Sequence, residues 1–433
     1  MEITLSFVLL IAALIIGIPV PMAFFGVTVF LIIFGGYDPS FLLPYGYNKM
    51  SNMVLLAMPL FIMAGGVIEK GGLGKRLVDF IELFFGRIKG GLGIVAVVSC
   101  AVFGAISGSS NATQSVIGAI MWPRLDAAGY SKGFSAALLA SAALLGSFIP
   151  PSGIMIIYAW ISGCSVLACF LAVFAPGLIL TLLFSIFTYI WCQKNEPNIH
   201  MMPSLPRKEL PKHFLNTTTH AIPALLFPVI ILGGIYGGFV TPTEAAALSV
   251  LYAVPVGLWI YRGINGRGLY KVLVQTATTT GVIVVMLYCV MMLSRIYITE
   301  DLPGMIAKAL TGVSQNKYLI LLLINIILII IGMLMDDISA MMLSVPILLP
   351  VVELLGISPI HFAAIVGVNL GLGCITPPCA PLLFLASRLS NTPLGAMLKP
   401  TFLLILFIWL PMLLLVTYIP EISLFFPRLL LGI

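Results

Sequence analysis

Four short polar or proline-containing segments interrupt sequence that is otherwise apolar. Residues 107–113 (Ser-Gly-Ser-Ser-Asn-Ala-Thr) have a counterpart at residues 335–339, and residues 149–153 have one at residues 376–379. The last two segments each contain two successive prolines, which remove two backbone donors and clash with the preceding turn, so a helix must open there. Opened backbone at membrane depth is tolerated only where protein buries it or where it lines a wet cavity.

These interruptions carry the chemistry of an ion and acid site. Freed carbonyls and hydroxyls can coordinate a hard cation, and half-helix N-termini near Asn111, Ser152, Ile338 and Cys379 can hold a carboxylate through their dipoles. No Lys or Arg lies within the four segments. A bound anion would therefore depend on helix ends, on hydroxyls and on a bound cation.

Asp336 and Asp337 lie in apolar surroundings, where an acidic residue is costly and indicates function. We expect a cation role, and the alternative is that one or both cap the following half-helix. One can cap while the other binds. For residues 109–113 the alternative is a close helix contact between small residues, and for the proline pairs it is a simple kink.

The composition places most of the chain in lipid. Of its 433 residues, 61% are hydrophobic and only 8% are charged, which is far outside the range of soluble domains. A hydrocarbon core about 30 Å thick needs roughly 20 apolar residues per crossing, and residues 3–34, 166–191 and 319–334 qualify. The net charge of +6 is spread over short connections, which indicates membrane orientation and not nucleic-acid binding.

An internal repeat is visible in the residues. Sliding the chain against itself by 227 positions aligns a series of identical residues without a gap, among them Pro123 with Pro350, so the chain is predicted to contain two copies of one unit. The Lys and Arg residues of region 70–90 place it in the cytoplasm, whereas its counterpart 295–317 carries Glu300 and Asp301 and is expected to fall outside. Inverted repeats of this kind place a binding site near the bilayer midplane.

Both of these counterpart regions are amphipathic. Apolar residues recur at helical spacing from Leu73 to Ile88 and again from Leu302 to Val313. Each region is therefore predicted to lie along the interface as a lateral arm. Ordinary connecting helices would show the same spacing, so both interpretations remain open at this point.

Other classes of function fit less well. Residues 104–108 faintly resemble an intramembrane serine-protease motif, but only His361 lies near apolar sequence as a base. The two adjacent aspartates would point about 100° apart on a helix and cannot form a dyad. Residues 71–76 lack the spacing of an ATP-binding loop. Three histidines in the polar stretch 193–220 match no compact ligand motif, so no transition metal is expected.

The chain resembles, over essentially its whole length, the large membrane subunit of tripartite ATP-independent periplasmic (TRAP) transporters. The resemblance rests on six pieces of sequence, which are Gly108-Ser109-Ser110-Asn111-Ala112-Thr113, Gly129-Tyr130, Pro150-Pro151-Ser152, Thr241-Pro242-Thr243-Glu244-Ala245, Asn369-Leu370 and Thr376-Pro377-Pro378. The piece at residues 241–244 also matches a capping box, with Thr241 as N-cap and Glu244 at N3, and we assign it a structural role.

This resemblance implies an all-α polytopic membrane protein with an inverted repeat, two re-entrant hairpins, two broken helices and an elevator-type fold. The implied segments are scaffold helices at 1–69, an arm at 70–90, a first transport repeat at 91–193, a cytoplasmic linker at 194–220, scaffold helices at 221–294, a second arm at 295–316 and a second transport repeat at 317–433.

The resemblance also implies a function and partners. It implies sodium-coupled uptake of an organic acid, such as sialic acid or a C4-dicarboxylate, across a bacterial inner membrane, without an organic cofactor. The implied partners are a small four-helix membrane subunit and a periplasmic substrate-binding protein. A sodium/dicarboxylate symporter that works without a binding protein is the alternative.

The predicted site residues follow from the interruptions and from this resemblance. Predicted sodium-binding residues are Ser107, Gly108, Asn111, Gly146, Pro150, Met335, Asp336, Asp337, Gly373, Thr376 and Pro377. Predicted substrate-binding residues are Ser109, Ser110, Thr113, Pro151, Ser152, Ser339 and Pro378.

Overall fold

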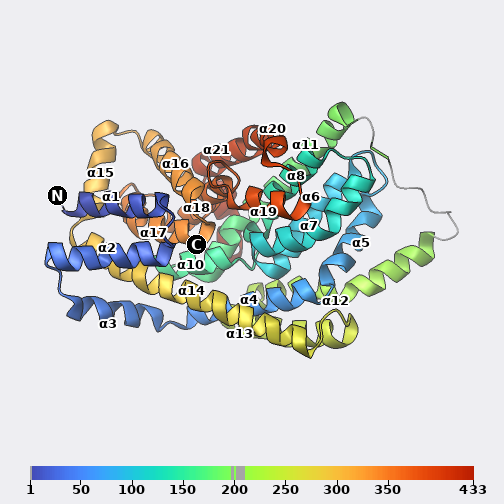
Figure 1. Cartoon of the computed structure of the whole chain (residues 1–433), viewed down its shortest axis with the longest axis horizontal. Coiled ribbons are helices and arrows are strands. Elements are labelled where there is room, and N and C mark those ends of the chain that lie inside the picture. The colour runs from blue at the N-terminus through green and yellow to red at the C-terminus, as the bar shows by residue number, and fades with distance from the viewer. Residues whose placement is uncertain (1, 197–198, 201–209) are drawn as a thin grey trace.

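The computed structural model describes residues 2–196, 199–200 and 210–433, and every regular element in these residues is a helix (Figure 1). Within them, eight helices are long and apolar enough to cross a membrane, or nine if a bent pair counts as one span. The chain is thus an all-helical polytopic membrane protein. Much of the expected linker at 194–220 lies outside the described residues.

The N-terminal region differs from the sequence-based expectation. Its helices are α1 (Glu2–Ile15), α2 (Val20–Gly35), α3 (Pro39–Met50) and α4 (Met53–Lys70). The predicted single crossing at residues 3–34 is wrong, because the chain reverses between α1 and α2, which lie side by side (Figure 1). The reversal uses Gly17 at φ +88°, a left-handed backbone that glycine adopts without strain, and Pro19 directly before α2.

A first group of helices follows α4 and contains the first hairpin and the first broken helix. Its members are α5 (Leu73–Phe85), α6 (Gly91–Ser107), α7 (Ser110–Ala127), α8 (Lys132–Ala143), α9 (Leu145–Phe148), α10 (Gly153–Ser162) and α11 (Val166–Asn195). The chain bends by 47° between residues 132–148 and residues 153–162. Helices α6 and α7 pack against each other, so residues 107–110 form the tip of a hairpin. Residues 149–152 form the break in the bent helix.

A second group has the same order of helices. Its members are α15 (Leu302–Val313), α16 (Lys317–Leu334), α17 (Asp337–Leu354), α18 (Pro359–Cys374), α19 (Pro381–Ser390), α20 (Leu394–Leu404), the π-helical turn η2 (Ile405–Trp409), α21 (Leu410–Tyr418) and α22 (Glu421–Leu431). Adding the offset of 227 to the bounds of α7 gives the bounds of α17. The hairpins α6/α7 and α16/α17 occupy opposite halves of the molecule and meet in the middle (Figure 1).

The remaining helices lie along one side of both groups. They are α12 (Leu210–Tyr236), α13 (Pro242–Pro255), which continues into the π-helical turn η1 (Val256–Ile260), and α14 (Gly266–Thr299). Helices α13 and α14 both pack against α4. The capping box at the start of α13 is confirmed, since Glu244 N donates to Thr241 Oγ1 and Thr241 N donates to Glu244 Oε2.

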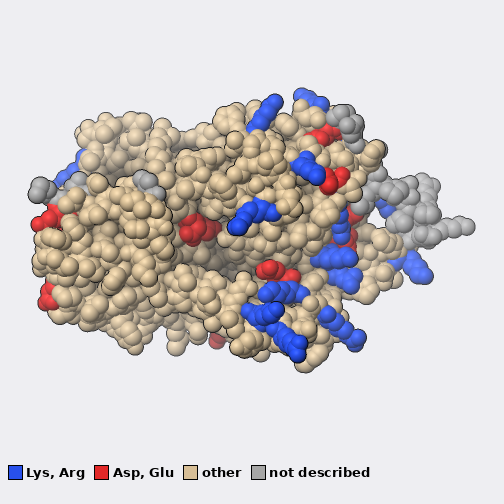
Figure 2. Space-filling view, viewed as in Figure 1, with Lys and Arg blue, Asp and Glu red and all other residues tan. Residues whose placement is uncertain are grey.

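In each of the two predicted arm regions, the helix is shorter than the region. The region 70–90 contains α5, and the region 295–316 contains α15, which begins only at Leu302 because α14 continues through Arg295 to Thr299. Helix α5 is fastened to the base of the first hairpin, where Arg124 of α7 pairs with Asp79 at 2.6 Å and with Glu82. In Figure 2 most of the visible Lys and Arg side chains lie over the right-hand half, the end at which Figure 1 shows α5.

Candidate functional site

The tip of the first hairpin is built from a glycine and a serine cap. Helix α6 ends at Gly108, which has a left-handed φ of +61°, and Ser109 caps α7 by accepting a hydrogen bond from Ala112 N at 3.4 Å. Thr113 Oγ1 donates to the Ser109 carbonyl at 2.8 Å and lies 3.2 Å from Ser107 Oγ. The hydroxyls of this tip are thus held in a fixed arrangement by their neighbours.

The two aspartates at the tip of the second hairpin differ in burial and in hydrogen bonding. Asp336 is exposed and caps α17, with Oδ2 accepting from Ser339 N at 3.3 Å and Oδ1 accepting from Ser339 Oγ at 2.5 Å. Asp337 is only 7% exposed and is the first residue of α17. The capping alternative therefore applies to Asp336, and the buried carboxylate is that of Asp337.

The two tips touch each other. Ser110 Oγ donates to Asp337 Oδ2 at 3.3 Å, and these two residues are 227 positions apart, which is the offset of the sequence repeat. They are the first residues of α7 and α17. The N-terminal ends of two half-helices therefore meet beside a buried carboxylate, where the helix dipoles favour negative charge.

The first break is buried against the first tip. Pro150, Pro151 and Ser152 are buried, the bond between the prolines is cis, and Ser152 Oγ accepts from Met155 N at the start of α10. Gly153 N donates to the Gly108 carbonyl at 3.1 Å. The backbone at the break is thus joined directly to the backbone of the hairpin tip.

Glycines allow each hairpin to approach its broken helix closely. A Cβ at Gly146 would lie 2.3 Å from Thr113 Oγ1, and a Cβ at Gly104 would lie 2.6 Å from the Cα of Gly146. In the second group, a Cβ at Gly373 would lie 2.5 Å from the backbone of Gly332. Any larger side chain at these positions would force the hairpin and the broken helix apart.

The second break has different surroundings from the first. Pro377, Pro378 and Cys379 are exposed, although Cys379 N still donates to the Met333 carbonyl of the second hairpin at 3.3 Å. Pro378 and Cys379 line an apolar cavity of about 530 Å³. The sequence predicted that all four interruptions converge on one place. The second break instead borders a separate cavity, which residues of α1 and α15 also line.

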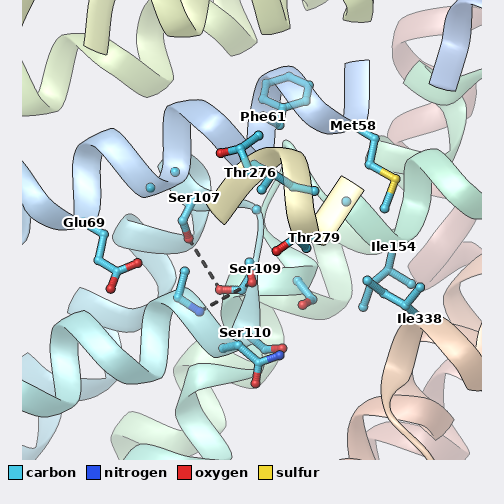
Figure 3. Close-up of a pocket in the computed structure, with 18 of the residues that line it drawn as sticks. Met58, Phe61, Glu69, Ser107, Ser109, Ser110, Ile154, Thr276, Thr279 and Ile338 are labelled. Atoms are coloured by element: carbon cyan, nitrogen blue, oxygen red, sulfur yellow. Dashed lines mark hydrogen bonds between the residues drawn. The ribbon is translucent and has the colours of Figure 1, made fainter. Parts of the chain in front are cut away.

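The other three interruptions border a polar cavity of about 340 Å³ (Figure 3). Of the site residues predicted from the sequence, those that line this cavity are Ser107, Gly108, Ser109, Ser110, Asn111 and Asp337. Its opposite wall comes from α4, including Phe61, Gly65 and Glu69, and from α14, including Gln275, Thr276 and Thr279. The cavity thus lies between the hairpin tips and the helices along their side.

The other predicted site residues do not line this cavity. Those of the first group support the tip or the break, namely Thr113, Gly146, Pro150, Pro151 and Ser152. In the second group, Asp336 and Ser339 form the cap of α17, and Gly373 contacts Gly332. Thr376 Oγ1 donates a hydrogen bond to the Leu372 carbonyl. Met335 and Pro378 line the apolar cavity, and Pro377 is exposed.

Sequence reasoning missed the wall formed by α4 and α14. Glu69, Gln275, Thr276 and Thr279 lie in uninterrupted helices, so no break in the backbone marks them. For the three residues of α14, the helical spacing of polar side chains is the sequence feature that could have identified them. Ser147 was also missed; it lines the cavity from α9, and its hydroxyl is buried without a hydrogen-bond partner among the residues that the structure describes.

Comparisons with known proteins agree with this architecture. Residues 6–422 match the family model described as "Tripartite ATP-independent periplasmic transporter, DctM component". The chain is 36% identical to the C4-dicarboxylate TRAP transporter large permease protein DctM of Pseudomonas aeruginosa over 88% of each chain. It is 32% identical to the sialic acid TRAP transporter large permease protein SiaM of Vibrio cholerae over 96% of each chain.

One further relative and one solved structure are also similar to this chain. An isethionate TRAP transporter permease protein, DctMQ of Oleidesulfovibrio alaskensis, is 34% identical over 95% of this chain, which spans 64% of that relative's length. Among solved structures, the Alcanivorax borkumensis YdaH transporter has a similar fold, with a TM-score of 0.65, 16% identity and coverage of 87% of this chain and 86% of that one.

The family match covers nearly the whole chain, and the two large permease relatives named above are aligned over 88% and 96% of each chain. Of the six pieces of sequence that carried the resemblance, the one at residues 108–113 lines the polar cavity with its residues 108–112. The chain therefore belongs to the DctM family and is the large membrane subunit of a TRAP transporter.

Proposed function

We propose that this protein carries out sodium-coupled uptake of a small organic acid across a bacterial inner membrane by an elevator mechanism. The proposal rests above all on the contact between Ser110 and Asp337, because it joins two half-helix N-termini and a buried carboxylate at the wall of a polar cavity. Such a site suits an acid group bound together with a hard cation.

The donor atoms around the cavity fit sodium. All polar side chains of the hairpin tips offer oxygen, which is the ligand that hard cations take. The Asp337 carboxylate is buried, and the Ser147 hydroxyl beside the cavity has no hydrogen-bond partner within residues 2–196, 199–200 and 210–433. We propose that sodium is held among Ser107, Gly108, Asn111, Asp337 and the first break, and that a second ion uses the region of Gly373, Thr376 and Pro377.

The elevator part of the proposal follows from the two sides of the cavity. The hairpins and broken helices would form the moving unit, and α4, α13 and α14 would form part of the fixed scaffold. The cavity extends along α4 from Met58 to Glu69, which is next to the basic residues that follow this helix. We infer that the cavity opens toward the cytoplasm, because basic connections lie on that side.

We propose that the partners are a small four-helix membrane subunit and a periplasmic binding protein that delivers the substrate. The support is that relatives are named as components of tripartite transporters for C4-dicarboxylates, sialic acid and isethionate. A symporter that works without a binding protein remains the second candidate. Transport that proceeds at full rate with free substrate alone would favour this second candidate.

The experiment that tests sodium coupling compares the two aspartates in a reconstituted transporter. Asp337→Asn removes the buried carboxylate, and uptake should lose most of its activation by sodium. Asp336→Asn keeps an oxygen able to cap α17, so it should cost about 1 kcal/mol or less in stability and retain sodium activation. Sodium activation that is unchanged in Asp337→Asn would remove this carboxylate from the mechanism.

A further inference from the structure

The side chains that line the polar cavity have an unbalanced charge. Among the described residues, the lining contains two carboxylates, Glu69 and Asp337, and no Lys or Arg. The nearest basic residue along α4 is Lys70, whose Nζ donates to Gln275 Oε1 at 3.5 Å. Within the part of the chain that the structure describes, neither carboxylate forms an ion pair. The cavity therefore offers a cation more than one place to bind.

The two carboxylates lie on different walls. Asp337 belongs to the second hairpin and contacts Ser110, whereas Glu69 belongs to α4 on the other side of the cavity. Gly65 of α4 lies against the first tip, since a Cβ there would be 3.4 Å from the Ser107 carbonyl oxygen. Glu69 is one helical turn further along, about 6 Å away along the axis. Figure 3 shows Glu69 at the edge of the cavity.

The first tip supplies a place for an acid group. Ser110 and Asn111 are the first two residues of α7 and line the cavity, and the first amides of a helix have no intrahelical partner. An acid group at this end is favoured by the helix dipole. This end of α7 and Glu69 line the same cavity of about 340 Å³.

We infer that the substrate is a zwitterion, with an acid group at the N-terminus of α7 and a cationic nitrogen paired with Glu69. This inference rests on the proposed function and adds the charge class of the substrate. Sodium beside Asp337 compensates that carboxylate, but it leaves the carboxylate of Glu69 facing the ligand. A dianion would place its second negative group toward Glu69, whereas a cationic nitrogen gains a charge-assisted hydrogen bond there.

The test measures binding of two probes to the purified full-length protein in nanodiscs, with and without sodium. Ectoine is a small zwitterion and succinate is a dianion of similar size. In sodium, ectoine should raise the thermal unfolding midpoint at lower concentration than succinate does. Glu69→Gln should weaken ectoine binding about tenfold and leave succinate binding unchanged or stronger. Glu353→Gln, an exposed glutamate away from the cavity lining, is the matched control.

The outcomes separate this inference from the proposed function. Sodium-dependent binding that favours succinate, or ectoine binding that Glu69→Gln leaves unchanged, would overturn the zwitterion assignment while supporting the sodium-coupled site. A midpoint that neither probe moves, with or without sodium, would overturn both. Equal weakening by Glu69→Gln and Glu353→Gln would also overturn the assignment, because it would reflect a general loss of negative charge.

Discussion

Gly108 is the position at which a single methyl group tests the architecture of the site. Its φ of +61° lies in the left-handed region, where a residue with a Cβ costs about 1–2 kcal/mol. A Cβ there would also lie 2.3 Å from the Pro151 carbonyl oxygen. A Cβ is fixed directly to the backbone, and the Pro151 carbonyl is itself part of the backbone, so neither atom can rotate away. The overlap is relieved only by separating the hairpin tip from the break, which we expect to cost about 1–3 kcal/mol more.

The expected total for Gly108→Ala is therefore about 2–5 kcal/mol, or a loss on the order of 30- to 5,000-fold in the population of the intact tip. Gly163→Ala is the matched control, since Gly163 ends α10 at φ +70° and a Cβ there would have no atom within 4 Å. It should show the backbone cost of about 1–2 kcal/mol alone.

The assay is uptake into proteoliposomes, normalised to the amount of inserted protein, together with the thermal unfolding midpoint of each variant. Gly108→Ala should lower both quantities more than Gly163→Ala does, and uptake should fall further than the amount of inserted protein. Equal unfolding midpoints and equal uptake in the two variants would refute the argument that the tip and the break must touch for transport.

Two further predictions concern contacts that hold the helices together. Arg124→Gln should slow uptake and leave the affinity for the substrate unchanged, because Arg124 joins α5 to the first hairpin and does not line the cavity. Exchanging the charges of Arg124 and Asp79 should recover part of the uptake rate. A changed affinity in Arg124→Gln would contradict this reasoning. Asn325→Leu breaks the buried hydrogen bonds of Asn325 with Asn369 and Thr417, so it should lower stability by about 0.6–1.7 kcal/mol, and an unchanged unfolding midpoint would contradict it.

Hydropathy and repeat spacing were sufficient to predict much of the fold. The apolar run at 166–191 lies within α11, and the run at 319–334 lies within α16. The residues that cap helices were also readable, as Thr241 and Glu244 illustrate. These features depend on neighbouring residues alone, so a sequence contains the information that determines them.

Features that depend on distant residues were harder to predict. Hydropathy does not record a chain reversal, so the turn at Gly17 was missed. Arg295 suggested the start of an arm, but it lies in α14 with its guanidinium 5.2 Å from the centre of the Tyr45 ring. That aromatic partner, on α3, stabilises a cation within a long helix and cannot be identified from the local sequence.

The site was predictable where the backbone is interrupted and was not where helices are continuous. Ser109, Ser110 and Asp337 were identified because polar residues at a break are conspicuous in apolar sequence. Glu69 and Thr276 were not, because only the packing of α4 and α14 brings them to the cavity. The repeat also suggested equal surroundings for the two breaks, whereas α1 and α15 give the second break an apolar environment.

The short helices at the N-terminus have a consequence for the surrounding membrane. With 14 and 16 residues, α1 and α2 are about 21 and 24 Å long, less than the hydrocarbon thickness of about 30 Å. Where helices of this length face lipid across the bilayer, the lipid beside them has to thin locally or let its headgroups sink toward the protein. Since α1 borders the second hairpin at the apolar cavity, the proposed movement of that hairpin would change the energy of this deformation. Under that proposal, transport rates should depend on the acyl-chain length of the host bilayer.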